Sequence, residues 1–262
     1  MFSNLNYPKI KYLFIYSFKQ VNIKFSNYFL YQLGYILEFF VTVYIWVYNN
    51  PNNTDLISYL FFGYILQRLM WTNVLNFLSV NIFSGKIVNR LLLPINLTSF
   101  LLIREAGTRI IMNLTSSGLM FLFLPLFIGH LASPVWYFWL FLPFILIIGF
   151  LIDFFISISF ACLVFWLKEG FDPIYNFFTL GSKVLTGIYI PFNYLPSSLS
   201  QLMTYNPYSL LVYHPMQIYS GHYSIMQSAI VICSGIIWVI VLYLISQLML
   251  KLGLKEFESS GL

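Results

Sequence analysis

Residues 135–166 read VWYFWLFLPFILIIGFLIDFFISISFACLVFW, and this stretch decides the class of fold. It contains a single charged residue, Asp153, and a single proline, Pro143. About 20 largely apolar residues are enough for a helix to cross the hydrocarbon core of a bilayer. The stretch therefore predicts a membrane-spanning helix with residues to spare, and we expect it to tilt or to bend at Pro143.

The rest of the composition is also typical of a membrane protein. Of the 262 residues, 60% are hydrophobic and only 8% are charged, whereas about 25% are charged in a soluble domain. No soluble core could bury so much apolar surface. Cys162 and Cys233 lie inside apolar runs without the spacing of a metal or redox motif, and we interpret them as small buried hydrophobic residues.

Further apolar stretches predict an all-α membrane protein with a single transmembrane domain over residues 1–262. The six predicted spans are 28–48, 57–81, 108–129, 135–166, 173–190 and 225–249. Polar residues, Lys183 among them, interrupt the fifth span, so five spans is the main alternative. The sequence ahead of the first span has no small-residue cleavage site, and we expect this span to stay as an anchor.

The basic residues predict the orientation. With both termini in the cytoplasm, every lysine and arginine falls on the inner side except Arg68 and Lys183, which lie within spans. The opposite loops, 49–56, 130–134 and 191–224, contain no lysine or arginine. The pattern predicts a multi-pass protein of a bacterial-type plasma (inner) membrane.

Two segments outside the spans have their own character. Residues 8–26 predict an interfacial helix with one apolar face and Lys19 opposite it. Residues 191–224 are rich in proline, tyrosine and serine, and no charged residue occurs from Val184 to Leu250. We expect 191–224 to form short broken helices that dip into the outer leaflet, shielded by protein.

A third segment, SGKIVNRLLLP at 84–94, lies between the second and third spans. At about 100° per residue its side chains separate onto two sides of a helix. One side carries Ile87, Val88, Leu91 and Leu92, and the other carries Lys86, Asn89 and Arg90. This pattern predicts a short amphipathic helix at the cytoplasmic membrane face, resting on lipid or docked to a soluble partner.

The chain carries no signature of an enzyme. His130, His214 and His222 do not have metal-ligand spacing, and Gly181-Ser182-Lys183 lacks the rest of a phosphate-binding loop. We expect no catalytic residue, no metal site and no cofactor in this chain, and no binding to nucleic acid.

Four charged residues lie within the predicted spans, where burial is costly. Their depths predict two polar pairs between helices, Glu38 with Arg68 and Asp153 with Lys183. We interpret these pairs as structural bridges. The alternative is a polar substrate path or a proton relay.

The order of these elements resembles the permease subunits of type-2 ATP-binding-cassette exporters. Within them, the chain is similar to a poorly characterised drug/lipid-export-like branch that carries I-x-S-G-x-[IL]-x-x-x-L-L-x-P-[LI] after the second span. Here the motif is IFSGKIVNRLLLPI at 82–95. Further matches are Ser17-Phe18-Lys19, Phe165-Trp166, Gly187-Ile188-Tyr189-Ile190-Pro191, Tyr194-Leu195-Pro196, Asn206-Pro207 and Tyr213-His214-Pro215.

The resemblance implies a division of labour. The chain would form the translocation path, a separate cytoplasmic subunit would bind and hydrolyse ATP, and a second permease subunit, identical or paralogous, would complete the assembly in the lipid membrane. The segments 8–26 and 82–94 would contact the ATPase, the latter as a coupling helix. The implied contact residues are Phe18, Lys19, Gly85, Lys86, Ile87, Arg90, Leu91 and Leu92.

In that assembly Leu91 and Leu92 would fill a hydrophobic groove, while Lys86 and Arg90 would face acidic residues or lipid phosphates. The alternative function is an ion-coupled secondary transporter or channel that uses the four intramembrane charges. An intramembrane enzyme acting on lipid is disfavoured by the missing site.

Overall fold

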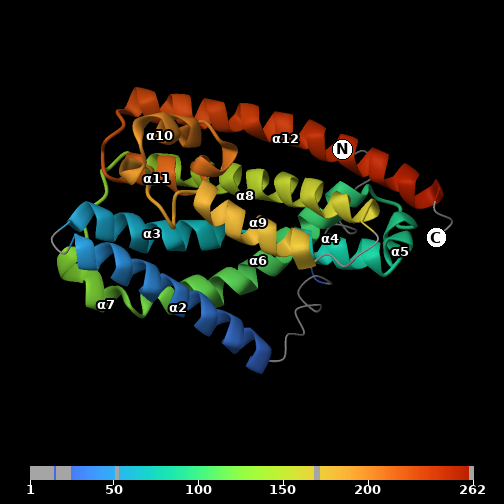
Figure 1. Ribbon diagram of the computed structural model, residues 1–262, viewed down its shortest axis with the longest axis horizontal. Coiled ribbons are helices and arrows are strands. Elements are labelled where there is room, and N and C mark those ends of the chain that lie inside the picture. Colours follow the sequence, from blue (N-terminus) through green and yellow to red (C-terminus); the bar gives the residue numbers. More distant parts are fainter. Residues whose placement is uncertain (1–14, 16–24, 51–52, 168–171, 260–262) are drawn as a thin grey trace.

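The structure, a computed structural model, describes residues 15, 25–50, 53–167 and 172–259. Within these residues every regular element is a helix (Figure 1), which confirms the predicted all-α class for this part of the chain. Nearly all of the predicted interfacial helix, 8–26, lies outside the described residues, and so do Phe18 and Lys19.

The first half of the chain forms helices α2 to α6. Their bounds are α2 Phe25–Asn49, α3 Thr54–Met70, α4 Val74–Phe83, α5 Ile87–Leu91 and α6 Leu97–Phe121. The second predicted span, 57–81, is therefore not one helix, because the chain breaks between Met70 and Val74. Carboxylates from other helices accept hydrogen bonds from the backbone N–H groups of Thr72 and Asn73, so the break leaves these donors satisfied.

Helix α6 corrects the third predicted span, because it begins at Leu97 rather than at residue 108. Arg104, Glu105 and Arg109 consequently lie inside the helix. Their charges interact with one another, since Glu105 forms salt bridges with both arginines. The predicted span began at residue 108 because charged residues precede it, but charged residues that pair with one another can lie within a helix.

The second half contains two long helices, α8 and α12, separated by shorter ones. The bounds are α7 Leu124–Phe127, η1 Ile128–His130, α8 Phe138–Cys162, η2 Leu163–Phe165, α9 Asp172–Leu185, η3 Phe192–Tyr194, α10 Ser197–Thr204, η4 Pro207–Leu210, α11 Tyr213–Tyr219 and α12 Ile225–Ser259. The segment 191–224 thus contains short helices, as predicted. Its position in the outer leaflet stays a prediction.

Two helix ends differ from the predicted spans. Helix α9 stops at Leu185, because Gly187 takes a left-handed backbone conformation with φ of +82° and its carbonyl accepts a hydrogen bond from Tyr59. Helix α12 has 35 residues, about 52 Å at 1.5 Å per residue. It extends past residue 249, because Lys251 and Lys255 end the apolar stretch but not the helix.

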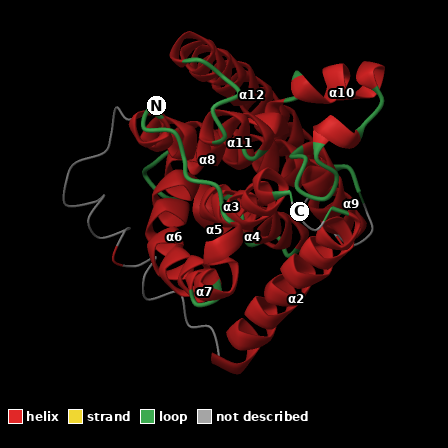
Figure 2. Ribbon diagram, turned by 90° about the vertical axis from the view of Figure 1, so that its left-hand side faces the viewer, coloured by secondary structure: helices red, strands yellow, loops and turns green. Residues whose placement is uncertain are grey.

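The core is built around α3 and α8. Helix α3 lies between α2, α6 and α8 (Figure 2), and α8 packs along α12 and α4. A Cβ atom at Gly149 of α8 would collide with the side chain of Met70 at the end of α3, so a glycine permits this close approach. Large rings that are fully buried, among them Phe39, Phe61 and Tyr64, fill the space between α2 and α3.

Among the described residues, two helical stretches are long and apolar enough to cross a bilayer, Phe138–Phe165 and Ile225–Phe257. Only 17% of the most apolar window of the second stretch is buried. Cys233 on this helix is exposed, which corrects the expectation that both cysteines are buried; Cys162 is buried. The count of six spans stays a prediction, because α3 and α9 are short and α6 carries charges.

The short helices gather at opposite ends of the molecule. Helix α5 lies at the same end as the last turns of α12, whereas α7, α10 and α11 lie at the other end (Figure 1). The segment 82–94 is therefore far from the segment 191–224, the arrangement expected if the two face opposite sides of a membrane.

Candidate functional site

The predicted amphipathic segment at 84–94 forms a tight turn followed by the five-residue helix α5. The backbone N–H groups of Ser84 and Gly85 donate to the last carbonyls of α4, which ends that helix. Gly85 then adopts φ of +70°, in the region that only glycine enters without strain. Because nothing lies within 4 Å of an added Cβ at Gly85, it is the backbone conformation and not space that requires glycine here.

The faces of α5 differ in part from the prediction. Ile87 is fully buried and anchors the helix, while Leu91 and Leu92 are 43% and 78% exposed. Lys86 is exposed, as predicted. Arg90 is not on the outer side with it: its guanidinium lies 5.8 Å from the ring centroid of Phe77 and also lies over Phe100.

Arg90 turns inward because two aromatic rings, one from α4 and one from α6, offer their faces at this point. A helical-wheel argument cannot anticipate this, since it takes no account of the helices that flank a short segment. The exposed surface of the segment therefore combines apolar side chains, Val88, Leu91 and Leu92 among them, with one cation, Lys86, rather than two.

The four charged residues predicted within spans pair differently from the prediction. Lys183 Nζ lies 2.6 Å from Glu38 Oε2, and the Tyr189 hydroxyl donates to Glu38 Oε1 at 2.8 Å. Arg68 lies with its guanidinium 5.0 Å from the Tyr35 ring centroid. The predicted pair of Glu38 with Arg68 is thus wrong, because depth alone does not distinguish two neighbouring helices whose cations lie at similar levels.

Asp153 has no contact with Lys183 either, because that lysine pairs with Glu38. Instead, Asp153 Oδ2 accepts two hydrogen bonds from Thr72, one from the backbone N–H at 2.6 Å and one from the hydroxyl at 2.7 Å. The aspartate is fully buried. Its position in α8 matches the break between α3 and α4, whose free N–H groups it partly satisfies.

A second carboxylate holds the other side of this break. Glu105 Oε2 of α6 accepts a hydrogen bond from the Asn73 N–H at 3.1 Å, and Glu105 is also fully buried. Arg104 lies 3.2 Å from Glu105 Oε1, and Arg109 lies 3.8 Å from Oε2. Two cations therefore offset the charge of the glutamate, which burial would otherwise make costly.

The broken helix links this cluster to the segment 84–94. Arg104 of α6 lies over the ring of Phe77 in α4, 3.6 Å from its centroid, and Arg90 lies near the same ring. Helix α4 thus runs from the carboxylates at Thr72 and Asn73 directly into the turn at Gly85. A displacement of α5 would act on α4 and, through it, on contacts with α6 and α8.

Beside the Glu38–Lys183 pair lies an apolar groove of about 510 Å³. It is lined by Leu37, Glu38, Val41, Thr42, Ile45, Trp46, Tyr189 and Ile190. The ion pair is therefore partly exposed, with side-chain exposures of 14% for Lys183 and 23% for Glu38. A charged group at the wall of an apolar groove can hold the polar end of an amphiphilic molecule.

The sequence reasoning missed Thr72, Glu105 and Tyr189. The signal for Glu105 was present, since it stands four residues before Arg109, the spacing of an ion pair on a helix, although both the glutamate and this part of the helix lay outside the predicted span 108–129. The polar pair Thr72-Asn73 in the middle of an apolar stretch was the signal for the break. Tyr189 was noted only within the family match at 187–191, and its bond to Glu38 could not be foreseen because it depends on the turn that follows α9.

The comparisons with known proteins give one family. A family model described as ABC-2 family transporter protein matches residues 49–261, most of the chain. A search of curated proteins finds no match.

Proposed function

The chain belongs to the ABC-2 family of transporter proteins, and on that premise we propose that it is the permease subunit of an exporter driven by a separate cytoplasmic ATPase. The family is a membrane component of ABC transporters, so the ATP would be bound and hydrolysed by the partner. This chain would need no cofactor of its own. It would lie in the plasma (inner) membrane with both termini in the cytoplasm.

The observation that carries the proposal is the exposed apolar tip of the coupling segment, residues 82–94. Leu92 is 78% exposed and Leu91 is 43% exposed, on a helix at the end of the molecule opposite to α10 and α11. Exposed leucines beside an exposed lysine suit a helix that docks into an apolar groove on another protein.

The coupling step is a transmitted displacement. Closure of the ATPase would move α5, and the turn at Gly85 would carry the movement into α4. The residues just before α4 are held by Asp153 of α8 and Glu105 of α6, so the displacement of α4 would be transmitted to α8 and α6. In physical terms, these helices would have two arrangements, and the nucleotide bound to the ATPase would determine which of the two is favoured.

The Glu38–Lys183 pair and its groove are the candidate part of the translocation path. A second permease subunit, identical or paralogous, would complete that path. The contacts of the intramembrane charges favour structural bridges over a proton relay, because Glu38 and Asp153 are each held by hydrogen bonds from within the fold.

The proposal is tested by purification of the tagged chain from its native membranes and identification of the proteins that co-purify with it. A stoichiometric ATPase partner, whose hydrolysis changes when the permease is present, supports the proposal. Ion-coupled transport by the purified chain alone, in vesicles without the ATPase, would overturn it and favour a secondary transporter or channel.

A further inference from the structure

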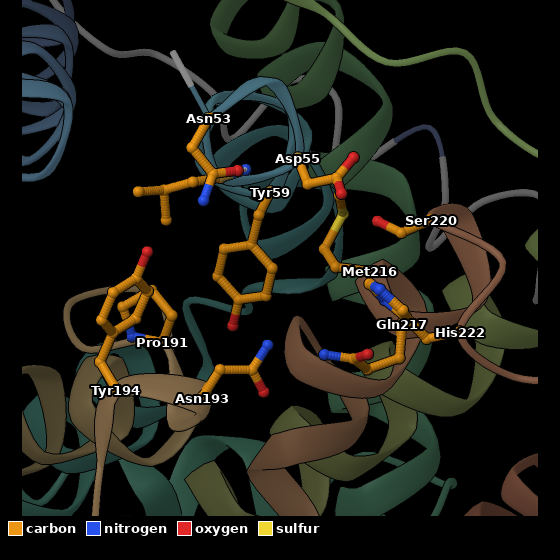
Figure 3. Close-up of a pocket in the computed structure, with 11 residues that line it drawn as sticks. Asn53, Asp55, Tyr59, Pro191, Asn193, Tyr194, Met216, Gln217, Ser220 and His222 are labelled. Carbon is orange, nitrogen blue, oxygen red and sulfur yellow. Dashed lines mark hydrogen bonds between the residues drawn. The ribbon is translucent and has the colours of Figure 1, made fainter. Parts of the chain in front are cut away.

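A second pocket lies far from the coupling segment, at the end of the molecule that holds α11. It has a volume of about 280 Å³, just below the range of about 300 to 1,000 Å³ for small-molecule sites. Three separate parts of the chain form it: the first turns of α3, the turn around η3, and α11 with the turn that follows (Figure 3).

The walls of this pocket are fixed by contacts within the fold. The Tyr59 hydroxyl donates to the Gly187 carbonyl at 2.9 Å. The ring of Tyr194 packs on Trp46 with 4.7 Å between centroids. The backbone N–H of His222 donates to the Gln217 carbonyl at 3.0 Å, which closes the turn after α11. The pocket is therefore formed before any ligand arrives.

Two amide side chains point into this preformed space. Figure 3 shows the amides of Asn193 and Gln217 directed towards one another beneath the ring of Tyr59. Gln217 is only 7% exposed, and within the described part of the chain its amide makes no hydrogen bond. The amide atoms face the pocket rather than the protein interior, so they are free to bond a group that enters it.

The remaining polar groups narrow the class of ligand. Asp55 contributes a carboxylate, and Ser220 contributes a hydroxyl. No lysine or arginine is among the lining residues, which leaves the imidazole of His222 as the one lining group able to carry a positive charge, opposed by the Asp55 carboxylate, so the lining does not favour an anion. Amides, a hydroxyl and a carboxylate together both donate and accept hydrogen bonds, as hydroxyl groups on a ligand require.

The aromatic and apolar walls complete the match. Tyr59, Tyr194 and Pro191 offer flat or apolar surfaces next to the amides. A sugar ring presents hydroxyls at its edge and C–H groups on its faces, so it can use both kinds of surface at once. We propose that this pocket binds a neutral polyhydroxylated group, a single sugar ring, either free or as the headgroup of a glycolipid.

This site is independent of ATPase coupling, and its test needs only the purified full chain. The chain is placed in nanodiscs of phosphatidylethanolamine and phosphatidylglycerol, because glucoside or maltoside detergents would themselves present a sugar. The free-sugar probe is methyl glucoside, read by saturation-transfer NMR. The lipid-linked probe is monoglucosyl diacylglycerol in the nanodisc, read as a rise in thermal midpoint over nanodiscs with diacylglycerol.

A signal in either arm from the natural chain supports the proposal and identifies the source of the sugar. In Asn193→Ala that signal should fall about 5-fold, the effect expected for one lost hydrogen bond of about 1 kcal/mol. Asn193 is exposed, so this change should leave the fold intact; Gln217→Ala should give the same loss. Gln201→Ala, an exposed amide on α10 outside the pocket, is the matched control and should bind normally.

Three results would overturn the proposal. They are the absence of any signal from both probes, a signal that Asn193→Ala leaves unchanged, and saturation transfer to tetramethylammonium but not to methyl glucoside. The last would assign the pocket to a cation held by Asp55.

Discussion

Thr72 and Asp153 are joined by two hydrogen bonds to one carboxylate oxygen, Oδ2, at 2.6 and 2.7 Å. One donor is the backbone N–H of a residue in the break between α3 and α4, and the other is its own hydroxyl. Asp153 lies on another helix, α8, and supplies the hydrogen-bond acceptor for the donors of Thr72 in this break. This contact, together with that of Glu105 with Asn73, explains how a helix can be interrupted inside an apolar region.

Replacement of Asp153 should show what this contact contributes. Asp153→Ala leaves the buried backbone N–H of Thr72 without an acceptor and its hydroxyl with only Ser157 Oγ, at 3.3 Å, and should lower the free energy of unfolding by about 2 kcal/mol. Asp153→Asn keeps an acceptor oxygen and should lose less. The measurement is the thermal unfolding midpoint of the purified protein. Equal losses in the two variants would contradict the role assigned to the oxygen.

The pair of Glu38 with Lys183 makes a second prediction. Lys183→Leu leaves Glu38 unpaired next to an apolar groove and should cost about 2 kcal/mol, while the double change with Glu38→Leu should cost less than the sum of the single changes. The control is Arg68→Leu combined with Glu38→Leu, whose effects should add. If the unfolding free energies instead show coupling between Glu38 and Arg68 and none between Glu38 and Lys183, the pair predicted from depth is right and the structure is contradicted.

These two clusters illustrate how far the sequence leads. The apolar runs predicted the helices and their approximate places, and the distribution of lysine and arginine predicted their orientation. The amphipathic pattern of SGKIVNRLLLP predicted a separate short helix. The partners of Glu38 and Asp153 could not be predicted. Rotation of each helix about its axis selects the partner, and that rotation depends on packing such as the contact of Gly149 with Met70.

The same limit applies to the break at Thr72 and to the start of α6. A run of apolar residues predicts one continuous helix. A break within it can be predicted only if the groups that accept hydrogen bonds from the freed backbone N–H groups are known. Those acceptors, Asp153 and Glu105, come from distant parts of the chain. The pocket between α3, η3 and α11 could not be predicted for a related reason, since these elements meet only in the folded protein.

Lys86 and Arg90 should separate partner binding from stability. Lys86→Glu changes an exposed charge and should weaken binding of the ATPase several-fold without a shift in thermal midpoint. Arg90→Glu removes a guanidinium from the faces of Phe77 and Phe100 and should lower the midpoint by the equivalent of about 1 kcal/mol. Both quantities are measured on the same purified variants. The reverse pattern would mean that Arg90 faces the partner.

The orientation can be checked with single cysteines in a chain that carries Cys162→Ala and Cys233→Ala. Lys86→Cys at the coupling segment should react with a membrane-impermeant maleimide only in inverted vesicles. Gln201→Cys on α10 should react only in intact cells, because α5, which follows Lys86, and α10 lie at opposite ends of the molecule. Labelling of both from the same side would contradict the predicted topology.

The central claim is that the tip of the coupling segment holds the ATPase, and the most direct measurement is co-purification of the ATPase with the chain carrying both Leu91→Asp and Leu92→Asp. We predict normal amounts of this variant in the membrane and loss of the bound ATPase. The matched control, Leu199→Asp with Leu202→Asp on α10 at the far end, should retain the ATPase. Retention of the ATPase at natural stoichiometry by the Leu91/Leu92 variant would contradict the account.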